Sequence, residues 1–278
     1  MSKSVSPLAG VVGWPIKHSK SPALHGHWLK RYDIAGDYSP ILLLHDDLET
    51  GLRRLSKKGF RGVNVTIPHK ESVLKLVDTI TDRAALIGAG NTIHFHADGS
   101  IGADNTDGYG FIQNLRQNAV DWDPKSSAAL VIGAGGAARA VVWALLNEGV
   151  TSVRLANRTR IRAENIAAHF GANVEVVEWS EISEAMDGVA TIVNTTSLGM
   201  EGQPELRINF DAAQQTALVT DIVYTPLNTP FLEKAKAHGL STVDGLGMLL
   251  YQAVPGFESW FGQTPEVDDE LRQAVLNA

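Results

Sequence analysis

The sequence predicts an α/β protein of two domains, each built on a parallel sheet covered by helices. Short apolar runs rich in β-branched residues alternate with segments of helical periodicity along most of the chain. At 278 residues the chain exceeds the usual size of one domain, and its 44% hydrophobic content suffices for two cores. A strand that runs into a glycine-rich turn and a helix near residue 133 indicates that one domain binds a dinucleotide.

Composition and charge limit the classes of partner. The net charge of -7 gives an overall field that does not attract nucleic acid or an anionic membrane. The absence of cysteine excludes disulfides, thiolate catalysis and cysteine-bound metal. Residues 1–13 hold no long apolar run, and no segment approaches the roughly 20 apolar residues that span a bilayer. We therefore expect a cytoplasmic monomer or homodimer that binds a small molecule, and neither nucleic acid nor a membrane.

The first part of the chain is predicted to form a βαβαβ series. Ser21 is expected to cap the first helix, with Pro22 at its first position. Asp46 is expected to cap the second helix, and Gly59 to end it. The expected strands are 8–13, 38–44 and 62–67, and the expected helices are 21–34 and 46–59.

The second part repeats the alternation of strands and helices. Its expected elements are strands at 127–133, 152–158, 174–179, 190–196 and 218–224, with helices at 137–149 and 162–171. The turn-rich stretch 104–118 marks the boundary between the domains. Segments 247–262 and 268–278 are helical in pattern and are expected to pack back on the first domain. The expected domains are 1–107 plus 246–278, which bind substrate, and 108–245, a Rossmann-like doubly wound domain.

The glycine-rich turn follows the strand AALVI directly and opens a helix. Gly133, Gly135 and Ala138 have the G-x-G-x-x-G/A spacing. Gly133 permits a tight turn, Gly135 lets the backbone approach a pyrophosphate, and Ala138 lets the helix pack closely on the sheet. A strand before the motif, a helix after it and a second strand further on favour dinucleotide binding over a plain turn.

The end of the second strand in this part predicts which dinucleotide is bound. NAD-binding domains place a carboxylate at this position for the ribose hydroxyls. This chain instead has Asn157, Arg158 and Thr159, followed by Arg160 and Arg162. Guanidinium groups can bind a 2′-phosphate through paired hydrogen bonds, so the pattern favours NADP. The alternative is that the arginines form a solvated helix start, and Arg160 is the one expected to be simply exposed.

A nicotinamide cofactor implies hydride transfer, which requires a group that exchanges the hydroxyl proton. Lysine and histidine can both do so. The nine histidines are scattered without the spacing of a metal site, and His94 and His96 are interpreted as surface or packing residues. Small polar residues instead recur at the strand ends of the first domain, where an open parallel sheet binds ligands. They suit a small polyhydroxylated acid, because each desolvated hydroxyl needs a partner. These stretches are HSKS (18–21), NVTIPHK (64–70), GNT (90–92) and DNTD (104–107).

Taken in chain order, the motifs resemble those of the shikimate/quinate dehydrogenase family. They are PIKHSKSP (15–22), NVTIPHK (64–70), GAGNT (88–92), DNTDG (104–108), GAGGAARA (133–140), NRT (157–159), NTTSLGM (194–200), DIVYTPLNTP (221–230) and DGLGMLLYQA (244–253). The resemblance covers essentially the whole chain. It implies a reversible, NADP-dependent reduction of 3-dehydroshikimate to shikimate in the shikimate pathway.

The resemblance also implies roles for individual residues. Lys70 and Asp107 would form the catalytic pair, in which the lysine exchanges the proton and the aspartate orients it. Ser19 and Ser21 would hold the substrate carboxylate. The residues implied to bind the ring hydroxyls or to lie near the substrate are Asn64, Thr66, Asn91, Tyr224 and Gln252. The residues implied to contact NADP are Gly133, Gly135, Gly136, Ala137, Asn157, Arg158, Thr159, Arg162, Thr195 and Met248.

Plainer roles stay open for many of these residues. Lys70 and Asp107 can be an ion pair that closes the domains, Tyr224 can pack between domains, and Met248 can fill a core. The serines can be helix caps, and the remaining polar residues can satisfy turns, strand ends or a helix surface. Two other functions also stay open: a quinate dehydrogenase with relaxed cofactor choice, and a ligand-sensing protein without catalysis. Retention of both Lys70 and Asp107 argues against the second.

Overall fold

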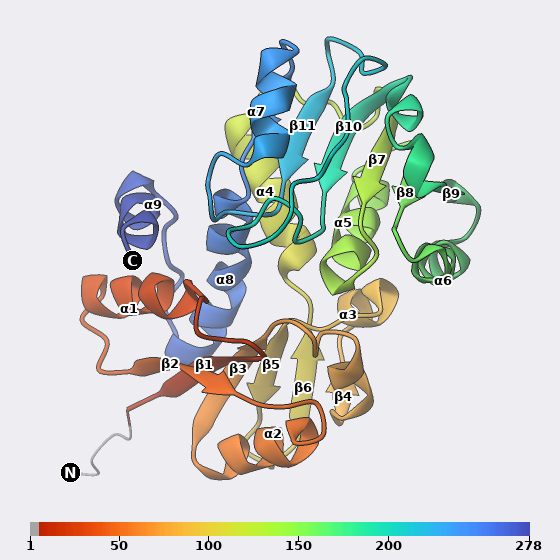
Figure 1. Ribbon diagram of the computed structural model, residues 1–278. Coiled ribbons are helices and arrows are strands. Elements are labelled where there is room, and N and C mark those ends of the chain that lie inside the picture. Colours follow the sequence, from red (N-terminus) through yellow and green to blue (C-terminus); the bar gives the residue numbers. More distant parts are fainter. Residues whose placement is uncertain (1–5) are drawn as a thin grey trace, which may run out of the picture. The chain divides into compact units, whose positions relative to one another are not determined.

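The computed structural model describes residues 6–278, and it divides into two compact units. Unit 1 comprises the chain up to Asp107 together with Leu249–Ala278, and unit 2 is Gly108–Met248. Each unit contains its own six-stranded sheet with helices (Figure 1). The expected two-domain α/β class is confirmed. The expected domain limits, 107/108 and 245/246, stay predictions.

The sheet of unit 1 has the strand order β2-β1-β3-β5-β6-β4. The strands β1, β2 and β3 are parallel, as the βαβαβ pattern predicts. The expectation of a wholly parallel sheet is wrong, because β5 runs antiparallel to both β3 and β6. A tight turn joins β5 to β6, with the amide of His96 bonded to the carbonyl of Ser100, and so short a connection cannot cross over the sheet. The bounds are β1 Leu8–Gly13, β2 Asp37–Leu42, β3 Phe60–Val65, β4 Thr79–Ile80, β5 Thr92–Phe95 and β6 Ile101–Asp104.

The helices of unit 1 begin differently from the prediction. Ser21 is the first residue of α1, not its cap, and the hydroxyl of Ser19 accepts the Ser21 amide instead. The expected cap Asp46 is also wrong, because 45–47 form a turn and α2 begins after Asp47. The bounds are α1 Ser21–Arg31, α2 Leu48–Lys57, η1 Ser72–Lys75, α3 Asp82–Ile87 and α9 Asp269–Leu276, together with the part of α8 (Leu246–Phe261) from Leu249 onward.

One face of the unit 1 sheet is packed by aromatic side chains from α1 and α8. Trp28, Phe257 and Trp260 are all nearly inaccessible to solvent. The indole of Trp260 donates to the carbonyl of Ile93 and lies directly over Gly62, where a Cβ would come within 2.1 Å of the indole nitrogen. The C-terminal segment therefore completes the core of unit 1, as predicted from the sequence.

Unit 2 has a fully parallel sheet in the order β12-β11-β10-β7-β8-β9. From β7 the chain adds strands first on one side, β8 and β9, and then on the other, β10, β11 and β12. This is the doubly wound arrangement, and its switch point lies between β7 and β10. Buried clusters on the two faces of this sheet hold most of the apolar residues. The bounds are α4 Asp107–Asn118, β7 Ala128–Ile132, α5 Gly136–Asn147, β8 Val153–Ala156, α6 Arg160–Phe170, β9 Val174–Val177, β10 Val189–Asn194, β11 Leu218–Asp221, α7 Pro230–Ala237 and β12 Ser241–Val243.

Between residues 6 and 278, none of the helices has the length and apolar character that a membrane span requires. The first five residues, which belong to the N-terminal stretch expected to lack an apolar run, lie outside the described residues.

Candidate active site

An ion pair between Lys70 and Asp107 lies at the centre of the candidate site in unit 1. Lys70 Nζ is 2.5 Å from Asp107 Oδ2, and both side chains are shielded from solvent, with 16% and 5% exposed. Lys70 lies in a turn after Pro68, and the short η1 follows it. The carbonyl of Lys70 accepts the amide of Gly90 at 2.7 Å, which ties this turn to the GNT turn.

Asn91, in the GNT turn, joins the ion pair to the rest of the site. Its Nδ2 lies 2.9 Å from Asp107 Oδ1 and 3.1 Å from Gln252 Oε1. Its Oδ1 accepts the amide of Thr106 and the hydroxyl of Thr92. The two carboxylate oxygens of Asp107 therefore have different partners, an amide on one side and the lysine on the other. This geometry holds the carboxylate in a fixed orientation toward Lys70.

Three polar residues of this network were not predicted as site residues: Thr92, Asn105 and Thr106. All three are buried. The Thr106 hydroxyl donates to the Gln252 carbonyl at 2.8 Å, which fixes α8 to the strand end. Asn105 Oδ1 accepts a hydrogen bond from the amide of Asp107, and Asn105 Nδ2 donates to the carbonyl of Ala89. The signal was present in the sequence, since DNTD is a run of polar residues directly after a buried strand.

Asn64, at the end of β3, belongs to the same buried network. Its Nδ2 donates to the carbonyl of Asn91 at 3.2 Å and its Oδ1 accepts the hydroxyl of Tyr38 at 2.7 Å. Thr66 is partly buried beside it, and within residues 6–278 its hydroxyl makes no hydrogen bond. A free hydroxyl at this strand end is available to a ligand.

Ser19 and Ser21 lie at the start of α1. The Ser19 hydroxyl accepts the amide of Ser21 at 3.3 Å, and Ser21 itself is buried. Lys20 between them points elsewhere, because its Nζ donates to the carbonyls of Val275 and Leu276 in α9. The two serines thus lie at a helix N-terminus, where the free amides favour an anion.

The glycine turn of unit 2 leaves open space above the start of α5. Gly133 has a φ of +117°, a conformation that suits glycine, and its amide bonds to the carbonyl of Ala156. A Cβ on Gly135 would meet nothing within 4 Å, so the backbone is free to approach a phosphate there. The first turn of α5, which includes Gly136 and Ala137, has no acidic residue and no side-chain cap. These features fit a pyrophosphate at the helix N-terminus.

The segment after β8 also fits the predicted NADP site. Arg158 and Arg162 are exposed, and within the described part of the chain neither forms an ion pair. Arg160 is already paired with Glu164 and Glu178, which agrees with its interpretation as an exposed residue. Thr159 caps α6 without a side-chain hydrogen bond, and Asn157 Nδ2 donates to the carbonyl of Thr159. Two guanidinium groups are therefore available to a phosphate.

A buried acidic network that the sequence analysis did not predict lies at the carboxyl ends of β10 and β11. Asp221 accepts hydrogen bonds from Asn194 Nδ2 at 3.0 Å, from the Thr229 hydroxyl at 2.7 Å and from the amide of Val223. Burial raises the pKa of Asp221 to about 6, although these hydrogen bonds act in the opposite direction. The network fixes the loops that follow both strands. Thr195, after β10, is held separately, because its hydroxyl donates to the Ile132 carbonyl of β7.

The remaining predicted residues, Tyr224 and Met248, belong to unit 2. Tyr224 is partly buried on the loop between β11 and α7. Met248 is 7% exposed and packs in the apolar cluster of unit 2, which accords with core filling.

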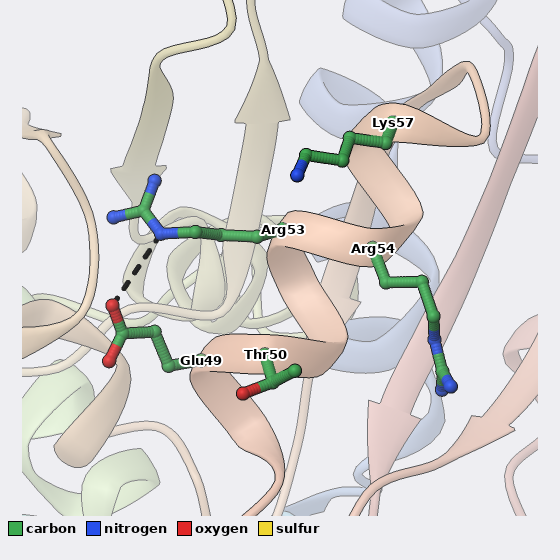
Figure 2. Close-up of a pocket in the computed structure, with 5 residues that line it drawn as sticks. All are labelled: Glu49, Thr50, Arg53, Arg54 and Lys57. Carbon is green, nitrogen blue, oxygen red and sulfur yellow. Dashed lines mark hydrogen bonds and ion pairs between the residues drawn. The ribbon is translucent and has the colours of Figure 1, made fainter.

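A separate pocket lies on the exposed side of α2 (Figure 2). Its cations do not converge, because Arg53 pairs with Glu49 and Arg54 points to the other side of the helix in this view. None of the predicted site residues lines it. The lining residues are Glu49, Thr50, Arg53, Arg54 and Lys57. Among residues 6–278, no group of three or more His, Asp or Glu side chains is placed to hold a metal ion.

A doubly wound sheet with an open glycine turn, together with a shielded lysine–carboxylate pair on a second unit, defines a nicotinamide-dependent oxidoreductase. Comparison with known proteins names the family. Residues 11–93 match the shikimate dehydrogenase substrate binding domain, 114–223 the shikimate / quinate 5-dehydrogenase domain, and 245–276 the shikimate 5′-dehydrogenase C-terminal domain. The chain belongs to the shikimate dehydrogenase family.

Individual relatives agree with this assignment. The shikimate dehydrogenase (NADP(+)) of Paracoccus denitrificans is 62% identical over 98% of this chain and 96% of its own. The shikimate 5-dehydrogenase of Thermus thermophilus, solved with NADP(H) and shikimate, has a TM-score of 0.86 at 34% identity, covering 98% and 99% of the two chains. The quinate dehydrogenase of Corynebacterium glutamicum, solved with NAD, has a TM-score of 0.90 at 30% identity with the same coverage. The predicted family, enzyme class and NADP cofactor are confirmed.

Proposed function

We propose that this chain catalyses the reversible NADP-dependent reduction of 3-dehydroshikimate to shikimate, with Lys70 and Asp107 as its catalytic pair. The observation that supports the pair is the 2.5 Å contact between Lys70 Nζ and Asp107 Oδ2. The other oxygen of this carboxylate, Oδ1, accepts a hydrogen bond from Asn91 Nδ2. A ketone oxygen that becomes a hydroxyl needs one proton, and a shielded ammonium held in one orientation is suited to deliver it.

The two side chains have distinct tasks in this proposal. In reduction, Lys70 Nζ gives a proton to the substrate oxygen and is reprotonated from solvent; in oxidation, the neutral amine takes the hydroxyl proton. Asp107 orients Nζ, and Asn91 prevents the carboxylate from turning away. When bound, the cofactor would supply the hydride as NADPH in reduction and accept it as NADP+ in oxidation.

The substrate contacts follow from the polar groups of unit 1. Ser19 and Ser21 present hydroxyls at the N-terminus of α1, which suits the carboxylate of the substrate. The ring hydroxyls are assigned to four buried or partly buried side chains of unit 1: Asn64, Thr66, Asn91 and Gln252. Tyr224 is assigned a position near the substrate.

The cofactor contacts are assigned to unit 2. Gly133, Gly135, Gly136 and Ala137 line the open glycine turn for the pyrophosphate. Arg158 and Arg162, with Asn157 and Thr159, are the residues available for the 2′-phosphate. Thr195 and Met248 are assigned to the nicotinamide side, although the Thr195 hydroxyl proton is already donated to the backbone and Met248 packs in a core.

Lys70→Ala tests the catalytic pair. We expect kcat to fall roughly a hundredfold or more while KM for shikimate changes little, because the lost group acts on the proton and not mainly on binding. NADPH formation is followed by absorbance with saturating NADP. Lys75→Ala is the matched control, since Lys75 is an exposed lysine on the neighbouring η1. A Lys70→Ala enzyme with near-normal kcat would remove Lys70 from the mechanism.

A quinate dehydrogenase is the second candidate, favoured by the similarity to the quinate dehydrogenase of Corynebacterium glutamicum. The free guanidinium groups of Arg158 and Arg162 argue against the NAD preference of that alternative. We expect the highest kcat/KM for shikimate with NADP when shikimate and quinate are each assayed with NADP and with NAD. A higher kcat/KM for quinate with NAD would support the alternative, and no turnover with any pair would support a ligand sensor. The cytoplasmic location and a monomeric or homodimeric state are proposals of the same kind.

A further inference from the structure

Tyr38, on β2, reaches across a strand to contact a residue of the candidate active site. In the register of the sheet, Tyr38 lies opposite Ala9 of β1, and Ala9 lies opposite Gly62 of β3. Asn64 is two residues beyond Gly62, on the same face of β3. The small side chain of Ala9 leaves room for the phenol ring over β1. Its hydroxyl bonds to Asn64 Oδ1 at 2.7 Å, and the Tyr38 side chain is almost fully buried.

The ring of Tyr38 is held in place by His25 of α1. The two rings are stacked with centroids 3.8 Å apart and an angle of 3° between their planes, and His25 is fully buried. Burial lowers the pKa of His25 to about 3, and the neighbouring Asn64 side chain opposes this shift only in part. Among residues 6–278, neither ring nitrogen of His25 has a hydrogen-bond partner. His25 is therefore a neutral, flat surface that fixes the phenol ring.

The phenol of Tyr38 keeps its proton. Burial raises its pKa well above the ordinary value, and the nearby Ser21 side chain opposes this shift only in part. A neutral phenol 2.7 Å from Asn64 Oδ1 donates to that oxygen. Asn64 Nδ2 then points to the carbonyl of Asn91 and the hydroxyl of Thr92. The carbonyl of Asn91 can only accept, so it decides which end of the Asn64 amide is the nitrogen, and the Tyr38 hydroxyl supplies the donor that holds the oxygen end in place.

We propose that Tyr38 is a positioning residue for substrate binding, which acts by locking the orientation of the Asn64 amide. The inference rests on the proposed function, in which Asn64 binds a ring hydroxyl of the substrate. Without the Tyr38 hydroxyl, Asn64 Oδ1 lacks its buried donor and the amide is held only through Nδ2, so the oxygen can leave the position from which it accepts the substrate hydroxyl. Tyr38 itself makes no contact with substrate in this proposal.

Tyr38→Phe tests the inference, because it removes the hydroxyl and keeps the stacked ring. We expect KM for shikimate to rise about tenfold, as for a buried acceptor left without its donor, with KM for NADP unchanged. Tyr32→Phe is the matched control: it also removes a phenol oxygen that makes a hydrogen bond in unit 1, but to the amide of Glu266. Unchanged KM for shikimate in Tyr38→Phe, with or without a lower melting temperature, would show a purely structural role and overturn the inference.

A double-mutant cycle with Asn64→Ala shows whether Tyr38 acts through Asn64. In the Asn64→Ala background, we expect Tyr38→Phe to change KM by less than about twofold, because the amide that it orients is gone. Additive effects would overturn the inference while leaving the proposed function intact. A normal KM for shikimate in Asn64→Ala would overturn the inference as well, with the activity still established. Absence of shikimate turnover in the unaltered enzyme would instead refute the proposed function.

Discussion

At the scale of single residues, Asn91 determines how the catalytic pair is presented. Three acceptors lie within hydrogen-bond distance of its Nδ2: Thr106 Oγ1, Asp107 Oδ1 and Gln252 Oε1. An amide nitrogen has only two protons, so the three acceptors share them. The Asn91 oxygen is occupied by Thr92 and Thr106 at the same time. A side chain with partners on every side cannot rotate, and the orientation of Asp107 follows from that.

Asp221 is the residue for which we predict a pH effect on stability. Its folded pKa, about 6, lies above its ordinary value of 3.8, so its favourable contribution is complete below pH 3.8 and is lost as the pH rises through 6. Asp221→Asn cannot titrate. We expect the free energy of unfolding of the variant, relative to the unaltered protein, to increase by about 3 kcal/mol between pH 4 and pH 7.

Urea denaturation across this pH range measures the difference. Asp121→Asn is the control, since Asp121 is an exposed aspartate in the same unit. The free energies of unfolding of Asp221→Asn and the unaltered protein are compared at each pH. If their difference stays constant with pH, Asp221 does not titrate in this range.

At the scale of elements, β3 shows how close packing is combined with a binding residue. Gly62 lies under the indole of Trp260 and beside the carbonyl of Ile93, and a Cβ would come within 2.1 Å of both. Two residues further on, the same face of the strand presents Asn64 to the site. The glycine therefore lets α8 approach the sheet, and α8 in turn supplies Gln252.

Gly62→Ala is expected to destabilise unit 1 strongly. Because one of the two clashing atoms is a backbone oxygen that cannot move aside, we expect a loss of about 3 kcal/mol or more in the free energy of unfolding. The denaturant midpoint measures it. Gly26→Ala is the matched control, since a Cβ at Gly26 in α1 meets nothing within 4 Å and alanine favours a helix. Equal midpoints for the two variants would contradict the packing argument.

At the scale of the whole molecule, the chain distributes two tasks over two units. Unit 1 holds the ion pair and the polar network, and it is assembled from both ends of the chain. Unit 2 is continuous in sequence and holds the glycine turn and the free arginines. The chain passes from one unit to the other at the start of α4 and within α8. Asp107 and Gln252 thus stand close to the two crossing points.

Much of this organisation could be predicted from the sequence. Strand and helix patterns depend on neighbouring residues along the chain. The βαβαβ series of unit 1, the glycine turn after β7 and the helical C-terminal segment were therefore all recognisable. The exact element ends were not, because the caps of α1 and α2 depend on turn geometry that neighbouring residues decide together. The antiparallel β5 was missed because the predicted alternation takes no account of a tight turn at 96–100.

The sequence by itself determined the fold class, the cofactor type and the residue types available for catalysis, since these depend on spacing along the chain. The family resemblance already implied that Lys70 pairs with Asp107. Only the tertiary structure decided that Asn91 joins Asp107 to Gln252 and that Tyr38 contacts Asn64. The physical reason is that a hydrogen bond depends on distances of about 3 Å and on direction. Packing of sheets and helices sets those quantities between residues that are far apart in sequence.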